Sequence, residues 1–185
     1  MNLINQWGNG SGCKLYENTK YGDERGYFEV IYNKHRLNEH GINFVQINQS
    51  HSMAKGTLRG LHLQLQPNEQ GKLVRCVKGK LFDAAVDLRR NSPGYLETTS
   101  VVLSEEDDYL FWIPRGFAHG FLTLEDNTRI EYLVDGDYSP SDERSLIWSD
   151  PTFSIDWPIE PSILSDKDNA AKNWMDQESE IRFKM

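Results

Sequence analysis

Long hydrophobic runs are absent from this chain of 185 residues, although 38% of its residues are hydrophobic. The longest apolar stretches, such as Tyr109–Pro114, fall far short of the roughly 20 residues that a membrane-spanning helix needs. The opening residues, MNLINQWGNGSG, contain no basic start, apolar run or small-residue cleavage site of the kind that marks a secretory signal. We therefore expect a cytoplasmic protein that has no membrane partner.

The chain has only two cysteines, and its 28 acidic residues outnumber its 20 lysines and arginines. The two cysteines, Cys13 and Cys76, form no Cys-x-x-Cys pair, so a disulfide framework, a zinc ribbon and a thioredoxin-like centre are not indicated. The formal net charge is −8, and the lysines and arginines are scattered. A nucleic-acid-binding protein needs a basic face, so we expect no nucleic-acid partner. A local cluster of cations can still bind a phosphorylated small molecule.

The common phosphate-binding and nucleophile motifs are also missing. The sequence contains neither GxGxxG nor GxxxxGK[ST], and it has no GxSxG elbow. Chemistry in this chain must therefore come from histidine, carboxylate, lysine and tyrosine side chains.

What is present is a series of short strand patterns with turn residues between them. Spacing of about 8 to 12 residues between turn signals is typical of a β-sandwich or barrel. Two helical patterns accompany the strands, at Asn33–His40 and at Ser165–Trp174, where Ser165 is the predicted N-cap. We predict a single domain over residues 1–185 with an all-β barrel or jelly-roll fold. The predicted strands are Phe44–Gln49, Thr57–Leu65, Lys72–Val77, Lys80–Leu88, Thr98–Leu103, Tyr109–Ile113, Phe117–Leu124 and Arg129–Val134.

His62 stands out among the five histidines because it lies within a strand pattern. Residues two apart share a face of a strand, so Gly60, His62 and Gln64 point together unless Gly60 bends the chain. Such a polar stripe inside a barrel suggests a lined cavity. A histidine that ties strands together fits the pattern equally well, and the same two interpretations apply to His119.

A metal site is not favoured. Metal-binding barrels of the cupin type use a close His-x-His pair with a nearby carboxylate, and this position reads His62-Leu63-Gln64. Transition metals need three or four good ligands. Lys72, Tyr132, Tyr138 and Asp168 each also admit a purely structural role when taken alone.

Taken together, the motifs resemble the dTDP-4-dehydrorhamnose 3,5-epimerase family. The resemblance covers roughly residues 20–170, and the motifs occur in the order of the family. They are GDERGYF, FVQINQS, GTLRGLHLQ, QGKLVRCVKGKLFDAAVDLR, NSP, WIPRGFAHGF, YSPSDE, IWSDP, IDWP and LSDKD. Each motif alone is weak, but the ordered set is very specific.

The resemblance implies a cupin-like jelly roll that uses no metal or cofactor. It also implies a homodimer in which N-terminal segments, here about residues 1–20, cross to the partner's sheet. The substrate that it implies is a nucleotide-linked 4-keto-6-deoxyhexose, in which protons on carbons 3 and 5 are removed and returned on the opposite face.

The resemblance further implies the role of each catalytic residue. His62 would be the general base, oriented by Asp168, and Tyr132 would reprotonate from the other side. Lys72 would stabilise the enolate oxygen.

The substrate-binding residues follow from the same resemblance. Arg59 and His119 would hold the substrate near the diphosphate and the ketone, and Tyr138 would line the sugar pocket. Tyr21 and Gln46 match positions that contact the nucleotide base, and Arg25 and Asn48 are also expected to bind substrate.

The sequence departs from the family pattern at two positions. The family usually reads RGxFxE, whereas this chain has Val30 at the glutamate position and a glutamate one place earlier, at Glu29. A one-residue shift on a strand sends a side chain to the other face, so the preference for thymine is an open question. Ile47 replaces the usual aspartate of FVQDN.

Other functions remain as alternatives. The first is an epimerase that acts at one carbon only or on another nucleotide sugar. From other classes come a non-catalytic sugar-binding barrel and a metal-dependent cupin oxygenase.

Overall fold

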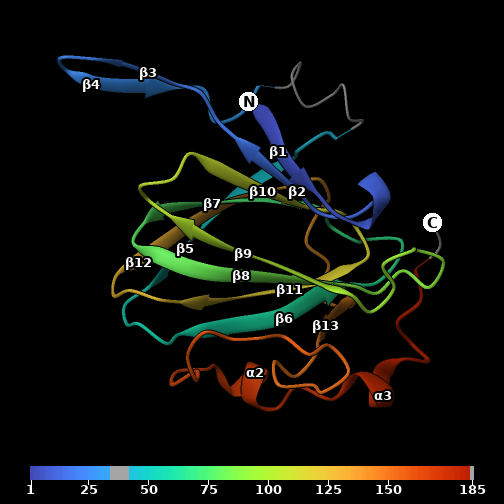
Figure 1. The fold of residues 1–185 in the computed structure, drawn as a ribbon. Coiled ribbons are helices and arrows are strands. Elements are labelled where there is room, and N and C mark those ends of the chain that lie inside the picture. The colour runs from blue at the N-terminus through green and yellow to red at the C-terminus, as the bar shows by residue number, and fades with distance from the viewer. Residues whose placement is uncertain (34–41, 184–185) are drawn as a thin grey trace.

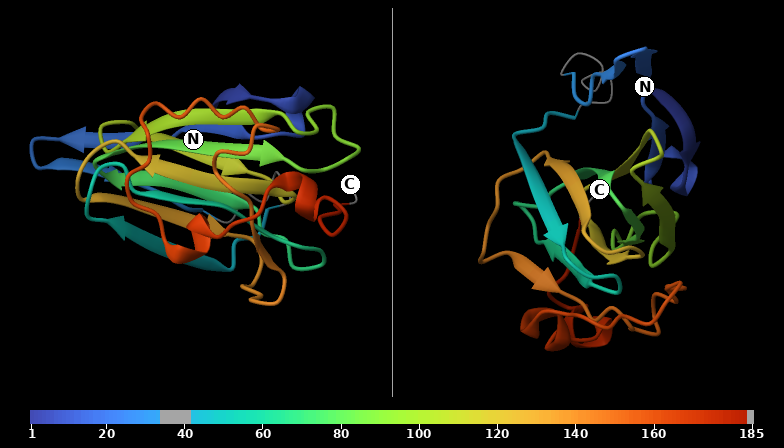
Figure 2. Two further views of the ribbon diagram at one scale, coloured as in Figure 1. Left: turned by 90° about the horizontal axis from the view of Figure 1, so that it is seen from below. Right: turned by 90° about the vertical axis from the view of Figure 1, so that its left-hand side faces the viewer.

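A computed structural model describes residues 1–33 and 42–183 of the chain. Two antiparallel sheets face each other in a sandwich that looks barrel-like from one end (Figures 1 and 2). No helix in these two ranges is long and apolar enough to cross a membrane.

The first sheet has six strands in the order β1-β2-β10-β7-β12-β5. In chain order, their bounds are β1 Asn2–Gln6, β2 Lys14–Glu17, β5 Gln46–Ser52, β7 Lys72–Lys78, β10 Tyr109–Ile113 and β12 Thr128–Val134. Strand β5 is an edge strand, and Ile47 near its start and Val45 just before it are exposed.

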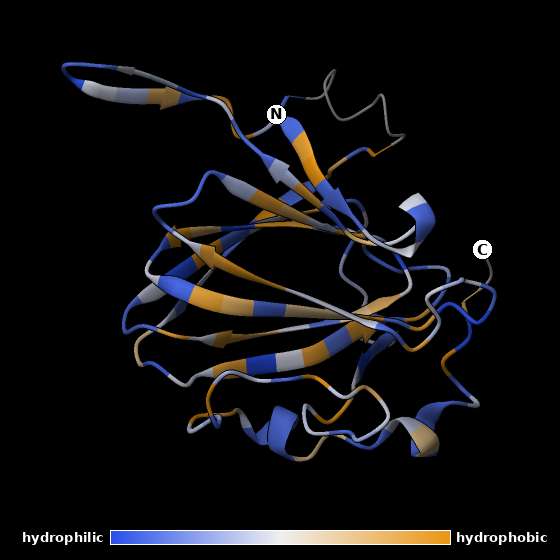
Figure 3. Ribbon diagram, viewed as in Figure 1, coloured by the Kyte–Doolittle hydropathy of each residue, from blue (hydrophilic) through white to orange (hydrophobic). Residues whose placement is uncertain are grey.

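The second sheet has five strands in the order β13-β6-β11-β8-β9. Their bounds are β6 Leu58–Gln64, β8 Lys80–Asp87, β9 Thr98–Ser104, β11 Phe117–Thr123 and β13 Glu143–Ser145. Hydrophobic and hydrophilic residues largely alternate along β6 (Figure 3), as a strand between two different environments requires.

Apolar side chains of both sheets form the core between them. Val74 and Phe111 from the first sheet join Leu81 and Phe121 from the second in one buried cluster. The cleft described below borders this cluster, and both polar and apolar side chains line it.

The C-terminal segment covers the outer face of the second sheet, beneath β6 in Figure 1. Trp174 and Phe153 from this segment pack with Leu61 and Leu63 of β6. Burying a side chain such as Phe153 contributes about 1.5–3 kcal/mol. This packing fixes the C-terminal segment firmly against the strand that carries His62.

A separate two-stranded hairpin, β3 (Lys20–Asp23) and β4 (Gly26–Glu29), projects away from the sandwich (Figure 1). Its aromatic side chains Tyr21, Tyr27 and Phe28 are 57%, 62% and 65% exposed. The strands before it, β1 and β2, pair within this chain's own sheet, because β2 lies beside β10. The projecting element is therefore the hairpin of residues 20–29, and the crossing of residues 1–20 to a partner stays a prediction.

All eight predicted strands are present within a few residues of their predicted bounds. Strands β1 to β4 and β13 were not predicted, because their sequences are short and mostly polar. Residues 34–40 of the predicted helix Asn33–His40 lie outside the described residues.

The predicted helix Ser165–Trp174 is wrong in its extent. It is two short helices, α2 (Asp166–Asn169) and α3 (Trp174–Gln177). The backbone between them pairs with Leu146 through Lys172, whose carbonyl accepts from Ile147 N–H at 3.0 Å. The residues just after β13 thus pair with Lys172 as strands do, and this pairing replaces the middle of the predicted helix. A short 3-10 turn, η1 (Gly8–Gly10), is the remaining helical element of the described residues.

Candidate active site

Gly60 bends strand β6 at the cleft. Its φ is +116°, and a Cβ built there would lie 2.6 Å from Gly120 Cα and from the carbonyl oxygen of His119. Only glycine tolerates both conditions. The bend brings Arg59 and His62 to the same cavity, although an unbent strand would point them to opposite faces. Gly60 is therefore the local reason that these two residues share a site.

His62 is held by a carboxylate. Its Nε2 lies 2.6 Å from Asp168 Oδ1. Burial raises the pKa of Asp168, but the hydrogen bonds that it accepts, first of all from His62, outweigh burial and lower it. Asp168 is thus an anion that accepts the Nε2 proton, which leaves Nδ1 of His62 free to take up a proton.

Asp168 is itself fixed by the start of helix α2. The N-cap Ser165 accepts from the backbone N–H of Asp168 at 3.1 Å and donates its hydroxyl to Asp168 Oδ2 at 2.9 Å. The predicted N-cap is therefore confirmed. The cap holds the carboxylate in one orientation towards His62.

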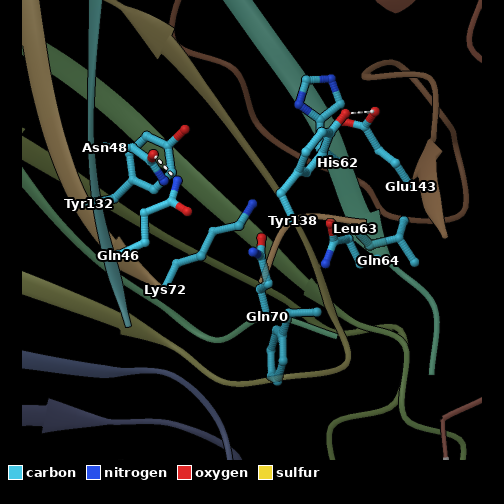
Figure 4. Close-up of a pocket in the computed structure, with 11 residues that line it drawn as sticks. Gln46, Asn48, His62, Leu63, Gln64, Gln70, Lys72, Tyr132, Tyr138 and Glu143 are labelled. Atoms are coloured by element: carbon cyan, nitrogen blue, oxygen red, sulfur yellow. Dashed lines mark hydrogen bonds between the residues drawn. The ribbon is translucent and has the colours of Figure 1, made fainter. Parts of the chain in front are cut away.

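Two adjoining chambers of about 320 Å³ and about 440 Å³ form the cleft. His62, Lys72 and Tyr132 line both of them. Figure 4 shows the side chain of Lys72 extending into the space between Tyr132 on one side and His62 on the other. The three groups come from β6, β7 and β12, so both sheets contribute.

Burial changes the acidity of two of these groups. It lowers the pKa of Lys72 to about 8, and it raises the pKa of Tyr132. Tyr132 consequently keeps its phenol proton at neutral pH, and Lys72 is still mostly an ammonium there. A base, a proton donor and a cation around one cavity suit proton transfer at a carbon beside a carbonyl group.

His119 lies behind Lys72, deep in the wall of the second chamber. Its Nδ1 is 3.4 Å from Lys72 Nζ, and its Nε2 is 2.8 Å from Asp83 Oδ1. The side chain of His119 is 7% exposed. His119 is thus a buried link between two charged side chains and presents little surface to the cleft.

Arg59 supplies a cation to the second chamber. Its guanidinium donates to the His51 carbonyl at 3.1 Å and to Ser52 Oγ at 3.4 Å. These contacts aim the side chain across from β6 towards β5. A guanidinium in that place can bind a phosphate group.

Tyr138 and Glu143 form the rim of the first chamber. The hydroxyl of Tyr138 donates to Glu143 Oε2 at 3.0 Å (Figure 4). Lys167 Nζ lies 2.6 Å from Glu143 Oε1. This bridge connects the loop after β12 with helix α2. Tyr138 is 57% exposed, and this bridge holds its side chain in a defined position.

Gln46 and Asn48 extend the first chamber along β5, and Gln46 Nε2 donates to Asn48 Oδ1 at 2.5 Å. Tyr21 and Arg25 do not join them within one chain. Both lie on the projecting hairpin, where Arg25 pairs with Asp23 at 2.5 Å. The described chain therefore assembles every predicted site residue except these two.

Sequence reasoning missed Asp83 and Glu143. Asp83 was available as a signal, because it is an acidic residue within the apolar run Leu81–Val86, where an unpaired charge is costly. Glu143 gave no comparable signal, because it lies in the polar stretch SPSDER.

Gln64, which stands where a metal-binding barrel has its second histidine, has other partners. Its side-chain oxygen accepts from the backbone N–H of Ser139 at 2.8 Å, and its amide group donates to the carbonyls of Asn68 and Asp137. No group of three or more His, Cys, Asp or Glu side chains is arranged to hold a metal ion within residues 1–33 and 42–183.

The sequence matches a family model over residues 10–176, and that model describes dTDP-4-dehydrorhamnose 3,5-epimerase. The chain belongs to the dTDP-4-dehydrorhamnose 3,5-epimerase family. A member from Shigella flexneri is 45% identical over 165 residues, which cover 88% of this chain and 91% of that protein. The family resemblance read from the motifs is thereby confirmed.

Solved structures of epimerases show the same fold. The dTDP-6-deoxy-D-glucose-3,5-epimerase of Legionella pneumophila Philadelphia 1, in complex with dTDP-4-keto-L-rhamnose, is 42% identical. It aligns with a TM-score of 0.91 over 100% of this chain and 99% of its own. A 3'-monoepimerase from Streptomyces bikiniensis, in complex with dTDP-quinovose, is 29% identical with a TM-score of 0.84 over 92% and 89% of the two chains. The cupin-like, all-β epimerase fold is thus confirmed for this chain.

Proposed function

We propose that this protein converts dTDP-4-dehydro-6-deoxy-D-glucose to dTDP-4-dehydro-L-rhamnose by inverting carbons 3 and 5, as a step in deoxysugar synthesis. The observation that carries the proposal is the cleft itself. Its common wall holds a carboxylate-bound imidazole, a protonated phenol and an ammonium. The Shigella and Legionella relatives, which carry this activity in their names, support the same reaction.

In this reaction His62 removes the proton beside the carbon-4 ketone through Nδ1. Asp168 stabilises the imidazolium that forms, because its anionic oxygen lies 2.6 Å from the other ring nitrogen. Lys72 stabilises the enolate oxygen, since an ammonium in a cavity with little water favours developing negative charge. Tyr132 then returns a proton to the opposite face of the carbon.

The remaining cleft residues bind the rest of the substrate. Arg59 pairs with the diphosphate in the second chamber, while Tyr138 covers the sugar at the rim of the first. Gln46 and Asn48 provide amide groups for the nucleotide. No resident metal is required, because the lysine supplies the positive charge that a metal would bring to the ketone.

The assembly that we propose is a homodimer in which the β3–β4 hairpin reaches the partner. Two features support it. The hairpin exposes Tyr21, Tyr27 and Phe28. Ile47 on the edge strand β5 and Val45 just before it are also exposed. An unpaired strand edge beside an apolar surface readily accepts another chain. The hairpin would then carry Tyr21 and Arg25 into the partner's cleft.

The preference for the nucleotide base is part of the proposal. Glu29 pairs with Arg75 at 3.1 Å and accepts from Asn18 Nδ2 at 2.9 Å, so its carboxylate is occupied within this chain. Val30, at the position where the family usually has glutamate, is apolar. We therefore expect dTDP-sugars to bind with looser discrimination of the base than in relatives that carry the glutamate.

The direct test is NMR in deuterated water with the 4-keto-6-deoxyglucose linked to dTDP, CDP or GDP. The proposal predicts deuterium at carbons 3 and 5 of the dTDP-sugar together with inversion at both. The 3'-monoepimerase relative makes inversion at carbon 3 alone the second candidate, which the same spectra distinguish. Binding without any deuterium uptake would identify a non-catalytic sugar-binding protein instead.

A further inference from the structure

Asp83 is a buried acid that the catalytic roles above do not use. It lies on β8 within an apolar run, and its side chain is 0% exposed. Its Oδ1 is hydrogen-bonded to His119 Nε2, while Oδ2 is buried without a hydrogen-bond partner in the described part of the chain. Retaining a carboxylate in such a place costs free energy, which calls for a functional explanation.

The geometry around His119 determines its tautomer. Lys72 is an ammonium that only donates hydrogen bonds, so the His119 Nδ1 that lies 3.4 Å from it must be unprotonated. The single proton of a neutral imidazole is then on Nε2, which donates to Asp83 Oδ1 at 2.8 Å. The doubly protonated form would point an N–H at the ammonium. Asp83, His119 and Lys72 are therefore consistent with one protonation state.

Other titratable groups also face the hydrogen-bonded series Asp83, His119 and Lys72. Arg59 and His62 face it from β6, Glu143 from β13, and Lys167 and Asp168 from α2, while the phenol of Tyr132 faces it from β12. Among these groups, Asp83 is the anion that contacts His119 directly, and Glu143 is already neutralised by Lys167.

We propose that Asp83 is a positioning residue of the epimerase, which fixes the Nε2–H tautomer of His119 and thereby keeps Lys72 protonated and directed into the cleft. Asp83 touches no substrate in this proposal. It acts through His119, whose Nδ1 accepts a hydrogen bond from the ammonium, and through its own negative charge. The proposed reaction is the basis of the kinetic consequence only, since the protonation states are properties of the protein without substrate.

The opposing effects of burial and charge support this role. Burial lowers the pKa of Lys72 to about 8, and the charge of Asp83 acts against that fall. Burial also lowers the pKa of His119, and Asp83 again opposes it. Without the carboxylate, Lys72 would lose its proton at a lower pH, and with it the ability to stabilise an enolate oxygen.

The test compares Asp83→Asn with a matched control, Asp87→Asn. Asp87 is a buried acid on the same strand and the same face, but it pairs with Arg89 at 2.7 Å and contacts neither Lys72 nor His119. Both variants exchange a buried carboxylate for an amide of the same shape. The control therefore reports the general cost of the exchange.

Two NMR measurements on the substrate-free protein give the direct readout. Lysine labelled with ¹³C at Cε, with Lys72 assigned by its loss in Lys72→Met, reports the titration midpoint of the amine. We expect Asp83→Asn to move that midpoint to lower pH by about one unit or more, as the loss of a nearby opposite charge does. Asp87→Asn is expected to leave it unchanged. Histidine labelled with ¹⁵N reports whether His119 carries its proton on Nε2.

The alkaline limb of kcat/KM against pH should move with the lysine midpoint in Asp83→Asn and should stay in place in Asp87→Asn. An unmoved lysine midpoint in folded Asp83→Asn would overturn the proposal. Should that variant fail to fold, the wild-type protein still decides, because an Nδ1–H tautomer or an imidazolium at His119 at pH 7 contradicts the proposal. A protein that shifts its lysine midpoint but epimerises no sugar would refute the proposed function alone.

Discussion

Asp168 at the start of α2 and His62 in the middle of β6 lie 2.6 Å apart, although 106 positions separate them in the chain. The strand supplies the proposed base, and the C-terminal segment that packs over the outer face of the same sheet supplies the carboxylate bound to it. If the pair works as proposed, His62→Ala should abolish deuterium uptake into the 4-keto sugar nucleotide. Asp168→Asn should lower kcat by about 10²-fold or more, because the imidazolium loses its stabilising anion.

The matched control for this pair is His51→Ala, since the side chain of His51 is exposed on β5 and belongs to no chamber of the cleft. Solvent exchange followed by ¹H NMR measures all three variants. Near-normal exchange in His62→Ala would show that another group is the base.

Tyr132→Phe is expected to separate exchange from inversion. Removal of a proton at carbon 3 requires only His62, whereas inversion requires a donor on the opposite face. Burial raises the pKa of Tyr132, so the phenol holds its proton for that step. We expect inversion at carbon 5 to fall more than exchange at carbon 3, as measured from product stereochemistry and deuterium content. Tyr109→Phe, a change outside the cleft on β10, should leave both rates as they are.

The wild-type enzyme should lose activity as the pH rises through about 8. The reason is the pKa of Lys72, which burial lowers to about 8, so that the stabilising ammonium becomes a neutral amine above that pH. Lys72→Arg should abolish this alkaline limb, because a guanidinium keeps its charge. Lys72→Met should reduce kcat by about 10²–10³-fold at every pH. A flat wild-type profile up to pH 9.5 would argue against Lys72 as the cation at the ketone.

Gly60→Ala should destabilise the fold and distort the site together. The φ of +116° alone costs a non-glycine residue about 1–3 kcal/mol, and the new Cβ would also meet Gly120 Cα at 2.6 Å. Gly26→Ala separates the two effects, because Gly26 has a φ of +125° with nothing within 4 Å of the added atom. Thermal unfolding should therefore show a larger fall in Tm for Gly60→Ala than for Gly26→Ala. Equal falls would mean that the close approach to Gly120 is unimportant.

The proposed dimer can be tested at the hairpin. Phe28→Asp places a charge in a side chain that is 65% exposed in the single chain but would be buried against a partner. Light scattering after gel filtration should show a shift from dimer to monomer. Met175→Asp, at a position that is 72% exposed on α3, should leave the mass unchanged. A monomeric wild-type protein would contradict the proposed assembly.

The sequence predicted the fold class and the eight central strands because their alternation and turn spacing reflect the sandwich directly. Helix α2 was found through its capping residue Ser165, but its end was not, since the pairing of Lys172 with Leu146 depends on a segment far away in the chain. Local patterns carry no information on such pairings. For the same reason the strands β1 and β2 were not predicted, because they join the sheet through the pairing of β2 with β10.

The candidate site was likewise predictable only in part. The residues themselves were predicted from ordered motifs, but their chemistry required the structure. Alternation suggested that Arg59 and His62 point apart, and only the bend at Gly60 brings them together. Taken alone, Lys72 admitted a purely structural role, whereas its burial in the structure lowers its pKa to about 8. Asp83 could have been noticed as an acid in an apolar strand, but its partner His119 lies 36 positions further along the chain.

The C-terminal segment has a consequence for how activity arises during synthesis. The ribosome makes His62 before Asp168, because 106 positions separate the two residues in the chain. A nascent protein that has already closed its two sheets still lacks the partner of its base. We expect such a chain to have a folded core but no epimerase activity, and catalysis should begin only after α2 has been translated.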